Sequence, residues 1–178
     1  MKGYFIFDMD GVLVEYRRDV NSSNCYELMS RKGYFSNLRP EWNMIGAIKN
    51  LKKLFPKNVF ILTSIYGKSY PYSKQEKIDY VKRVFPELLD NLIIVDVENG
   101  ETKPEKMAEV SGRQLDSSFF LIDDYGENLR NWGNSGGTPV KYLNLINNSH
   151  GTKYDFVLDC FMDSNEITAK LIEFQFSK

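Results

Sequence analysis

Five short apolar runs recur along this chain, and each of them ends next to a polar residue. The first four are made of β-branched, aromatic and leucine residues, which is typical of strands buried on both faces of a parallel sheet. In chain order the runs are Tyr4–Phe7, Val59–Leu62, Leu92–Val95, Phe119–Ile122 and Val140–Leu143, the last of which is interrupted by Lys141. These runs therefore predict a sheet in which they are the strands.

Helical patterns lie between and after the runs. Strands that alternate with helices predict an α/β fold, a parallel Rossmann-like sheet with helices on both faces. The length of 178 residues fits a single domain over residues 1–178. The apolar residues at helical spacing are Met44, Ile48, Leu51 and Phe55; Ile78, Val81 and Phe85; and Ile167, Leu171 and Phe174, the last set behind a capping box of Asp163 and Glu166.

The stretch from about residue 14 to residue 42 breaks this rhythm. It is polar and irregular at first, and it later contains Gly33-Tyr34-Phe35. A loop of this length inside a compact domain is usually functional or disordered. We therefore predict a small cap, inserted after the first strand, that covers one end of the sheet.

Carboxylates gather at the carboxyl ends of the expected strands. Asp8 and Asp10 follow the first run, and Asp123 and Asp124 follow the fourth. Ligands of open α/β sheets bind at this edge. Such a cluster repels itself unless a cation is present, and oxygen ligands suit a hard cation such as Mg²⁺. His150 is the only histidine, which excludes a zinc site built from several histidines.

Asp8 and Asp10 are two residues apart, so in an extended chain their side chains point the same way. One could act as a nucleophile while the other transfers protons, and Gly11 would allow a sharp turn. Each residue also has an ordinary interpretation: an aspartate at a strand end, a serine or threonine in a turn, an Asp-Asp helix cap, a surface lysine at Lys103. The chemical signal lies in their joint order.

Several functional classes find no support in the composition. The formal net charge of −1 gives no reason to expect nucleic-acid or membrane binding, and no apolar run approaches 18 residues. We interpret the basic residues around Lys74, Lys77 and Lys82 as solvated helix faces. Two distant cysteines form no disulfide framework, and no signal-peptide pattern precedes the first run, so we expect a cytoplasmic protein.

Two rival phosphate-binding folds do not fit. Gly67-Lys68-Ser69 resembles the end of a P-loop, but the required first glycine would fall at Leu62. A receiver domain has its acidic pair at the first strand and its lysine at the last, which is the reverse of the order here.

The ordered motifs resemble those of the haloacid dehalogenase superfamily. They are Asp8-x-Asp10-Gly11-Val12, Thr63 after Phe60-Ile61-Leu62, Lys103, and Leu121-Ile122-Asp123-Asp124. Within that superfamily the chain is most similar to the 5'(3')-deoxyribonucleotidase family and its bacterial and phage-type members. The residues that carry this closer similarity are Phe7–Leu13, Gly33-Tyr34-Phe35, Leu38, Pro40, Leu62-Thr63-Ser64, Pro71-Tyr72, Tyr125, Asn128-Leu129, Trp132, Gly136-Gly137 and Lys141.

The resemblance implies roles for individual residues. Asp8 would attack phosphorus and form an aspartyl phosphate, while Asp10 would protonate the leaving alcohol and later activate water. Thr63 would hydrogen-bond the phosphoryl group, with Ser64 close to the substrate. Lys103 would neutralise charge on Asp8 and on the phosphate.

The resemblance also implies a metal site and a substrate. Mg²⁺ would be held by the Asp8 carboxylate, the Asp10 carbonyl and Asp123, with Asp124 acting partly through water. The interval from Lys103 to Asp123 is longer than in the animal nucleotidases, so Lys106 is an alternative catalytic lysine. Further substrate-binding candidates are Tyr34 and Phe35, at the end of the predicted cap, and Lys68.

The resulting hypothesis is a Mg²⁺-dependent phosphomonoester hydrolase of the 5'-nucleotidase type, acting on (deoxy)nucleoside monophosphates. Alternatives within the enzyme class are a sugar phosphate or a nucleic-acid end as substrate. A different class is a non-catalytic phosphate-binding protein. We expect a small-molecule phosphomonoester as partner, no membrane, no stable nucleic-acid complex, and a monomer or homodimer.

Overall fold

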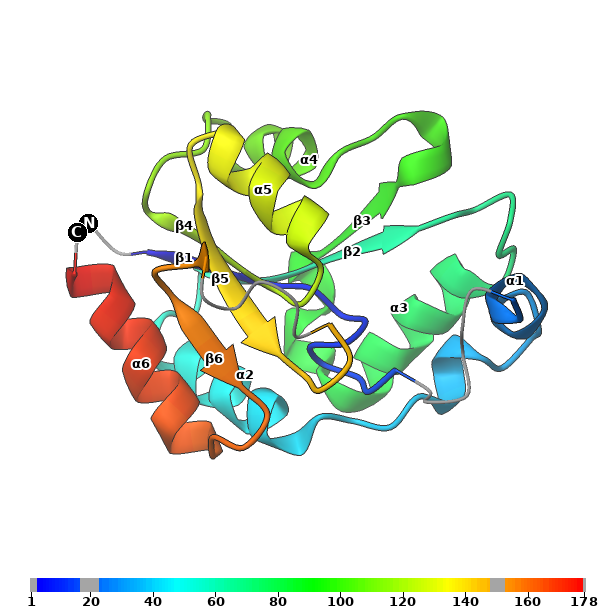
Figure 1. Ribbon diagram of the computed structural model, residues 1–178, viewed down its shortest axis with the longest axis horizontal. Helices are drawn as coiled ribbons and strands as arrows, with labels where there is room; N and C mark the ends of the chain where they lie inside the picture. Colours follow the sequence, from blue (N-terminus) through cyan, green and yellow to red (C-terminus); the bar gives the residue numbers. More distant parts are fainter. Residues whose placement is uncertain (1–2, 17–22, 148–152, 178) are drawn as a thin grey trace.

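The structure, a computed structural model, describes residues 3–16, 23–147 and 153–177. Its centre is a six-stranded, all-parallel sheet with the strand order β3-β2-β1-β4-β5-β6 (Figure 1). This confirms the predicted parallel α/β fold. The strands are β1 (Tyr4–Phe7), β2 (Val59–Ile65), β3 (Leu92–Asp96), β4 (Phe119–Asp123), β5 (Thr138–Leu143) and β6 (Val157–Asp159).

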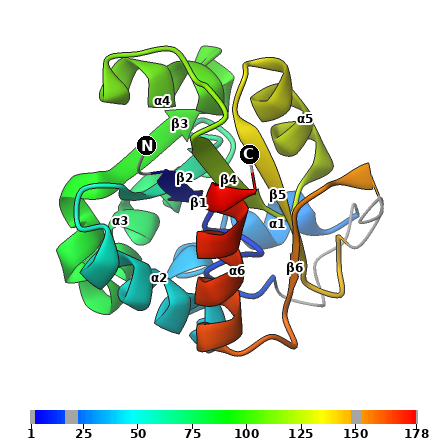
Figure 2. The ribbon, with the colours of Figure 1, turned by 90° about the vertical axis from the view of Figure 1, so that its left-hand side faces the viewer.

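Helices cover both faces of the sheet, as Figure 2 shows. One face carries α2 (Trp42–Leu54), α3 (Ser73–Val84) and α6 (Ser164–Phe176), and the other carries α4 (Lys103–Ser111) and α5 (Gly126–Asn134). The three segments with predicted helical spacing correspond to α2, α3 and α6. Shorter elements are α1 (Cys25–Met29) and the 3-10 helices η1 (Phe35–Asn37), η2 (Pro86–Asn91) and η3 (Val97–Asn99).

Strand alternation divides the core into two apolar clusters. Phe5 and Phe7 of β1 pack on the α2, α3 and α6 side, whereas Ile6 packs with Met107 and Trp132 on the α4 and α5 side. All five side chains are fully buried. The first strand is therefore held from both faces, which fixes the position of the residues that follow it.

The strands differ from the predicted runs at their ends. β2 continues to Ile65 because Ser64 and Ile65 still pair with β3, so Thr63 lies inside the strand rather than after it. β4 includes Asp123. The sequence did not predict β6, because three residues are too few to display a strand pattern.

The predicted cap is described in part. Residues 17–22 of this segment, like His150, lie outside the described residues. The remainder forms α1 and η1, and Val14 forms isolated bridges with Asp10 and Pro40. Figure 1 places α1 at the end of the sheet toward which the strand arrows point, and η1 packs against α3. Among the described residues, we find no helix with the length and hydropathy needed to cross a bilayer.

Helix α6 begins at the capping box that the sequence predicts. The Asp163 carboxylate accepts hydrogen bonds from the backbone N–H groups of Asn165 and Glu166, and the Glu166 side chain accepts from Asp163 N–H. We expect Asp163→Ala to lower the free energy of unfolding by about 1 kcal/mol, as for other lost N-caps. Urea denaturation measures this, and Asp163→Asn, which keeps an acceptor, should change it much less. Equal losses in both variants would contradict the capping role.

Candidate active site

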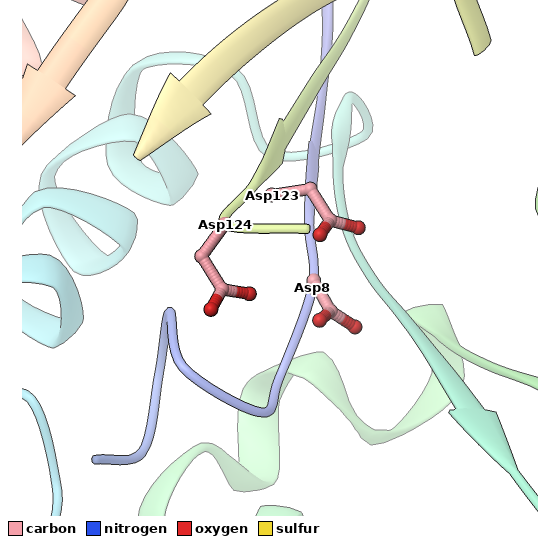
Figure 3. Close-up of side chains that lie close together, drawn as sticks. All are labelled: Asp8, Asp123 and Asp124. Carbon is pink, nitrogen blue, oxygen red and sulfur yellow. The ribbon is translucent and has the colours of Figure 1, made fainter. Parts of the chain in front are cut away.

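The candidate site begins where β1 and β4 end side by side. Asp8 directly follows β1, and its N–H donates to the carbonyl of Ile122 at 2.9 Å, which sets it beside Asp123. These strands lie where the strand order reverses, the position at which open α/β sheets bind ligands. Ligand atoms of Asp8, Asp123 and Asp124 all lie within 4.8 Å of one another, and Figure 3 shows the three side chains gathered at this edge.

Lys103 joins two of these carboxylates. Its ammonium Nζ lies 2.8 Å from Asp8 Oδ1 and 2.6 Å from Asp123 Oδ2, and the side chain is buried. Burial lowers the pKa of Lys103, but the two carboxylates outweigh it and raise the pKa above its usual value. Lys106 instead forms ion pairs with Glu101 and Glu109 at 3.1 Å each, so the structure brings Lys103 rather than Lys106 to Asp8.

Lys77 of α3 is the second lysine of the site, and its interpretation as part of a solvated helix face is wrong. Only 1% of its side chain is exposed. The Lys77 ammonium forms an ion pair with Asp10 Oδ2 and donates to Thr63 Oγ1 at 2.9 Å and to the carbonyl of Ser64 at 2.7 Å. Asp10 and Thr63, which are distant in sequence, are thereby connected through one side chain.

Asp124 is held by the loop that follows β5. Its Oδ2 accepts from Asn144 Nδ2 at 2.8 Å and from Asn147 Nδ2 at 2.6 Å. Buried Lys141 donates to the Asp124 carbonyl and to the Asn147 carbonyl. Leu145, between the two asparagines, adopts a φ of 67°, which a leucine rarely does. This loop therefore fixes the direction in which Asp124 points.

Burial and mutual repulsion raise the pKa values of the carboxyls. Burial, with repulsion from Asp8, raises the pKa of Asp123 to about 6 despite the opposing effect of Lys103. Burial, with repulsion from Asp123 and Asp8, raises the pKa of Asp124 to about 7. The pKa of Asp10 is also raised, chiefly by burial. Each shift means that the charged form is disfavoured until a cation compensates it.

The residues present fit a hard divalent cation. The side chains of the cluster, Asp8, Asp123 and Asp124, offer only carboxylate oxygens as metal ligands. One of these oxygens, Asp124 Oδ1, is buried and has no hydrogen-bond partner among the described residues. Gly11 is needed beside it, because a Cβ there would lie 2.5 Å from Asp124 Oδ2 and φ is +78°. Asp8, Asp123 and Asp124 would hold such an ion.

A cavity of about 410 Å³ opens in front of Asp8 and Asp10. Its walls come from the predicted cap, from the loop after β2 and from the starts of α3, α4 and α5. The lining combines aromatic side chains with carboxylate and amide groups. Among the lining residues are Tyr16, Phe35, Tyr66, Tyr70, Glu101, Glu127, Asn128 and Asn131.

The structure brings two of the four predicted substrate-binding residues to this cavity. Ser64 and Phe35 line it. Thr63 is fully buried and reaches the cavity edge only through Lys77. Tyr34 packs edge-on against Phe35, with ring centroids 4.8 Å apart, and does not line the cavity. Lys68 is exposed, its N–H is bound by Glu98, and it lies outside the lining, so its role stays a prediction.

Sequence reasoning missed Lys77, although a signal was present. The buried residues of α3 fall at i, i+3, i+4, i+7 and i+8, and this pattern places Glu76 and Lys77 on the buried face. Two charged residues on a buried helix face indicate buried partners. Tyr16 was also missed; it lines the cavity, and burial together with the nearby Asp10 raises the pKa of its hydroxyl.

No protein-family model and no curated protein matches the sequence. Solved structures do match over nearly the whole chain. The D,D-heptose 1,7-bisphosphate phosphatase of B. bronchiseptica, solved with magnesium and phosphate, has a TM-score of 0.68 at 15% identity, with 97% of this chain and 99% of that chain covered. A haloacid dehalogenase family hydrolase from Deinococcus radiodurans R1, solved with phosphate and sodium, has a TM-score of 0.64 at 13% identity. The match covers 97% of this chain and 96% of that chain.

A hydrolase of the same superfamily from Ehrlichia chaffeensis matches with a TM-score of 0.62 at 14% identity, over 98% of each chain. The chain has the haloacid dehalogenase fold. At these identities the likeness establishes the fold alone, and the superfamily's chemistry enters below as a proposal.

Cation binding should depend on pH in a defined direction. Protons would compete with a bound Mg²⁺ for Asp123 and Asp124, whose pKa values of about 6 and about 7 lie above the usual range. Affinity for Mg²⁺ should therefore fall as pH decreases, by at least about tenfold between about pH 7.5 and about pH 5.5. Calorimetric titration at the two pH values measures this, and unchanged affinity would contradict the assignment of these ligands.

Proposed function

We propose that this chain is a member of the haloacid dehalogenase superfamily that hydrolyses phosphomonoesters with Mg²⁺ and uses Asp8 as its nucleophile. The observation that carries this proposal is the Lys103 ammonium between Asp8 and Asp123, beside a cavity that Asp10 also lines. Phosphoryl transfer requires mainly alignment and neutralised charge, and this arrangement supplies both.

In the first step, an Asp8 oxygen forms a bond to phosphorus while the bond from phosphorus to the leaving oxygen breaks. The Lys103 ammonium forms an ion pair with Asp8 Oδ1, so Asp8 Oδ2 is the oxygen left to attack phosphorus. The leaving alkoxide takes a proton from the Asp10 carboxyl, whose burial raises its pKa and so favours the protonated form that this step needs.

In the second step, water attacks the phosphorus of the aspartyl phosphate and gives a proton to Asp10. The bond between the Asp8 oxygen and phosphorus breaks as the bond from water forms. Lys103 contacts two acceptors among the described residues, so its third hydrogen can donate to the phosphoryl group. A bound Mg²⁺ would supply charge neutralisation for the phosphoryl oxygens. Asp8, Asp123 and Asp124 would hold it, as would the Asp10 carbonyl.

The aromatic walls support a nucleoside monophosphate as the substrate. Tyr16, Phe35, Tyr66 and Tyr70 line the cavity, and rings of this kind offer flat apolar surfaces to a base. The volume of about 410 Å³ lies in the range of small-molecule sites.

A sugar phosphate is the second candidate. Glu101, Glu127, Asn128 and Asn131 line the same cavity and could hydrogen-bond sugar hydroxyls. The heptose bisphosphate phosphatase with the same fold is consistent with this alternative.

A phosphate-release screen over nucleoside monophosphates and sugar phosphates, with and without Mg²⁺, tests both candidates. We expect Mg²⁺-dependent release from a nucleoside monophosphate, and Asp8→Asn should reduce it by about 10³-fold or more while the protein stays folded. Preference for sugar phosphates would favour the second candidate. Near-full turnover by Asp8→Asn would overturn the mechanism, and phosphate binding without turnover by the wild type would indicate a non-catalytic protein.

The two lysines of α4 provide a matched pair of variants. Lys103→Met removes the ammonium between the carboxylates, so we expect kcat/KM to fall by about 100-fold or more. Lys106→Met removes only surface ion pairs and should change kcat/KM by less than about twofold. Steady-state kinetics at saturating Mg²⁺ measures both, with circular dichroism as the folding control. A larger loss of kcat/KM in Lys106→Met than in Lys103→Met would mean that Lys106, and not Lys103, is the catalytic lysine.

A further inference from the structure

Lys77 uses every hydrogen of its ammonium group on the protein itself. A lysine ammonium has three donors, and the structure gives it three acceptors: Asp10 Oδ2, Thr63 Oγ1 and the Ser64 carbonyl. No donor remains for a substrate phosphate. This distinguishes Lys77 from Lys103 and gives it the character of a positioning residue.

The Lys77 ion pair makes the two oxygens of Asp10 different. Oδ2 accepts from the ammonium, whereas Oδ1 is buried with no partner among the described residues. Asp10 lines the cavity, so the Lys77 ion pair fixes the orientation of its carboxyl group at the cavity wall. Lys77 also donates to Thr63 Oγ1, so the Thr63 hydroxyl keeps its own hydrogen to donate elsewhere.

Glu76, the preceding residue of α3, holds the cavity wall. Its carboxylate is buried and accepts from three backbone N–H groups of the predicted cap: those of Gly33, Phe35 at 2.9 Å and Ser36 at 3.3 Å. Phe35 lines the cavity, and its ring centroid lies 5.0 Å from Lys77 Nζ.

Successive helical residues project about 100° apart, so one turn of α3 reaches two different parts of the site. Through Glu76 it reaches the predicted cap, and through Lys77 it reaches the ends of β1 and β2.

We propose that Glu76 and Lys77 are a pair of positioning residues: Lys77 orients the Asp10 carboxyl toward the leaving group, and Glu76 sets Phe35 against that same group. This inference rests on the proposed phosphomonoester hydrolysis with Asp10 as the acid. It adds that the placement of the acid and of the cavity wall are both determined by α3.

The decisive variant is Lys77→Met, compared on two substrates. p-Nitrophenyl phosphate has a good leaving group that hardly needs an acid, whereas the best alkyl phosphate from the screen above needs one. We expect kcat/KM to fall by about 100-fold or more for the alkyl phosphate and by less than about tenfold for the aryl phosphate. Lys82→Met, the same change at an exposed position of α3, should alter neither value.

A second readout follows from the role of Asp10 in the second step. If Lys77→Met impairs activation of water, the aspartyl phosphate accumulates, and rapid mixing with p-nitrophenyl phosphate gives a burst of nitrophenolate that approaches the enzyme concentration. Lys77→Arg keeps the charge but not the three-way geometry. It should show the same substrate dependence in weaker form, and it serves as the test if the methionine variant does not fold.

Glu76→Gln separates the two halves of the pair. It should raise KM for the alkyl phosphate by about threefold or more while leaving the ratio of alkyl to aryl kcat unchanged, because Asp10 keeps its lysine. Equal losses on both substrates in Lys77→Met and Lys77→Arg, or no loss, would overturn the positioning role while phosphatase activity of the wild type stands. Failure of the wild type to release phosphate from either substrate would instead overturn the proposed function itself.

Discussion

Four aspartate carboxylates at the ends of β1 and β4 repel one another, and the elements around them compensate this repulsion. Buried charges of one sign are tolerated only when opposite charges and hydrogen bonds compensate them. Among the described residues, two lysines form ion pairs with these carboxylates, one from α3 and one from α4, and these helices lie on opposite faces of the sheet. The layered α/β architecture is what allows this, because each face contributes a helix whose charged side chain can reach the edge where the strands end.

Most of the fold could be predicted because buried parallel strands appear in the sequence as uninterrupted apolar runs. The runs before Asp8, Thr63 and Asp123 are apolar at every position, and a parallel sheet buried on both faces requires that. The chain order of these polar residues also placed them at one edge, where the structure has them. α4 and α5 were harder to predict from spacing, since each is only nine residues long and buries few apolar side chains.

The rest of the site depends on contacts between residues far apart in the chain. Lys77 lies 67 residues from Asp10, and Asn147 lies 23 residues from Asp124. A lysine on a helix and an asparagine in a loop look the same in sequence whether they face water or a buried carboxylate. Only the spacing of α3 carried a hint, because its buried face includes charged residues. The roles of the site residues in catalysis stay predictions.

The loop after β5 has a consequence for how this molecule could vary. Surface loops ordinarily accept inserted residues at little cost. Here Asn144 also donates to the Gly11 carbonyl at 2.9 Å, so the loop connects the turn after β1 to the carboxylate of Asp124. One added residue between Asn144 and Asn147 would shift the register of both amides. We therefore expect inserted residues to be tolerated in the cap segment but not in the loop after β5, although both are loop segments.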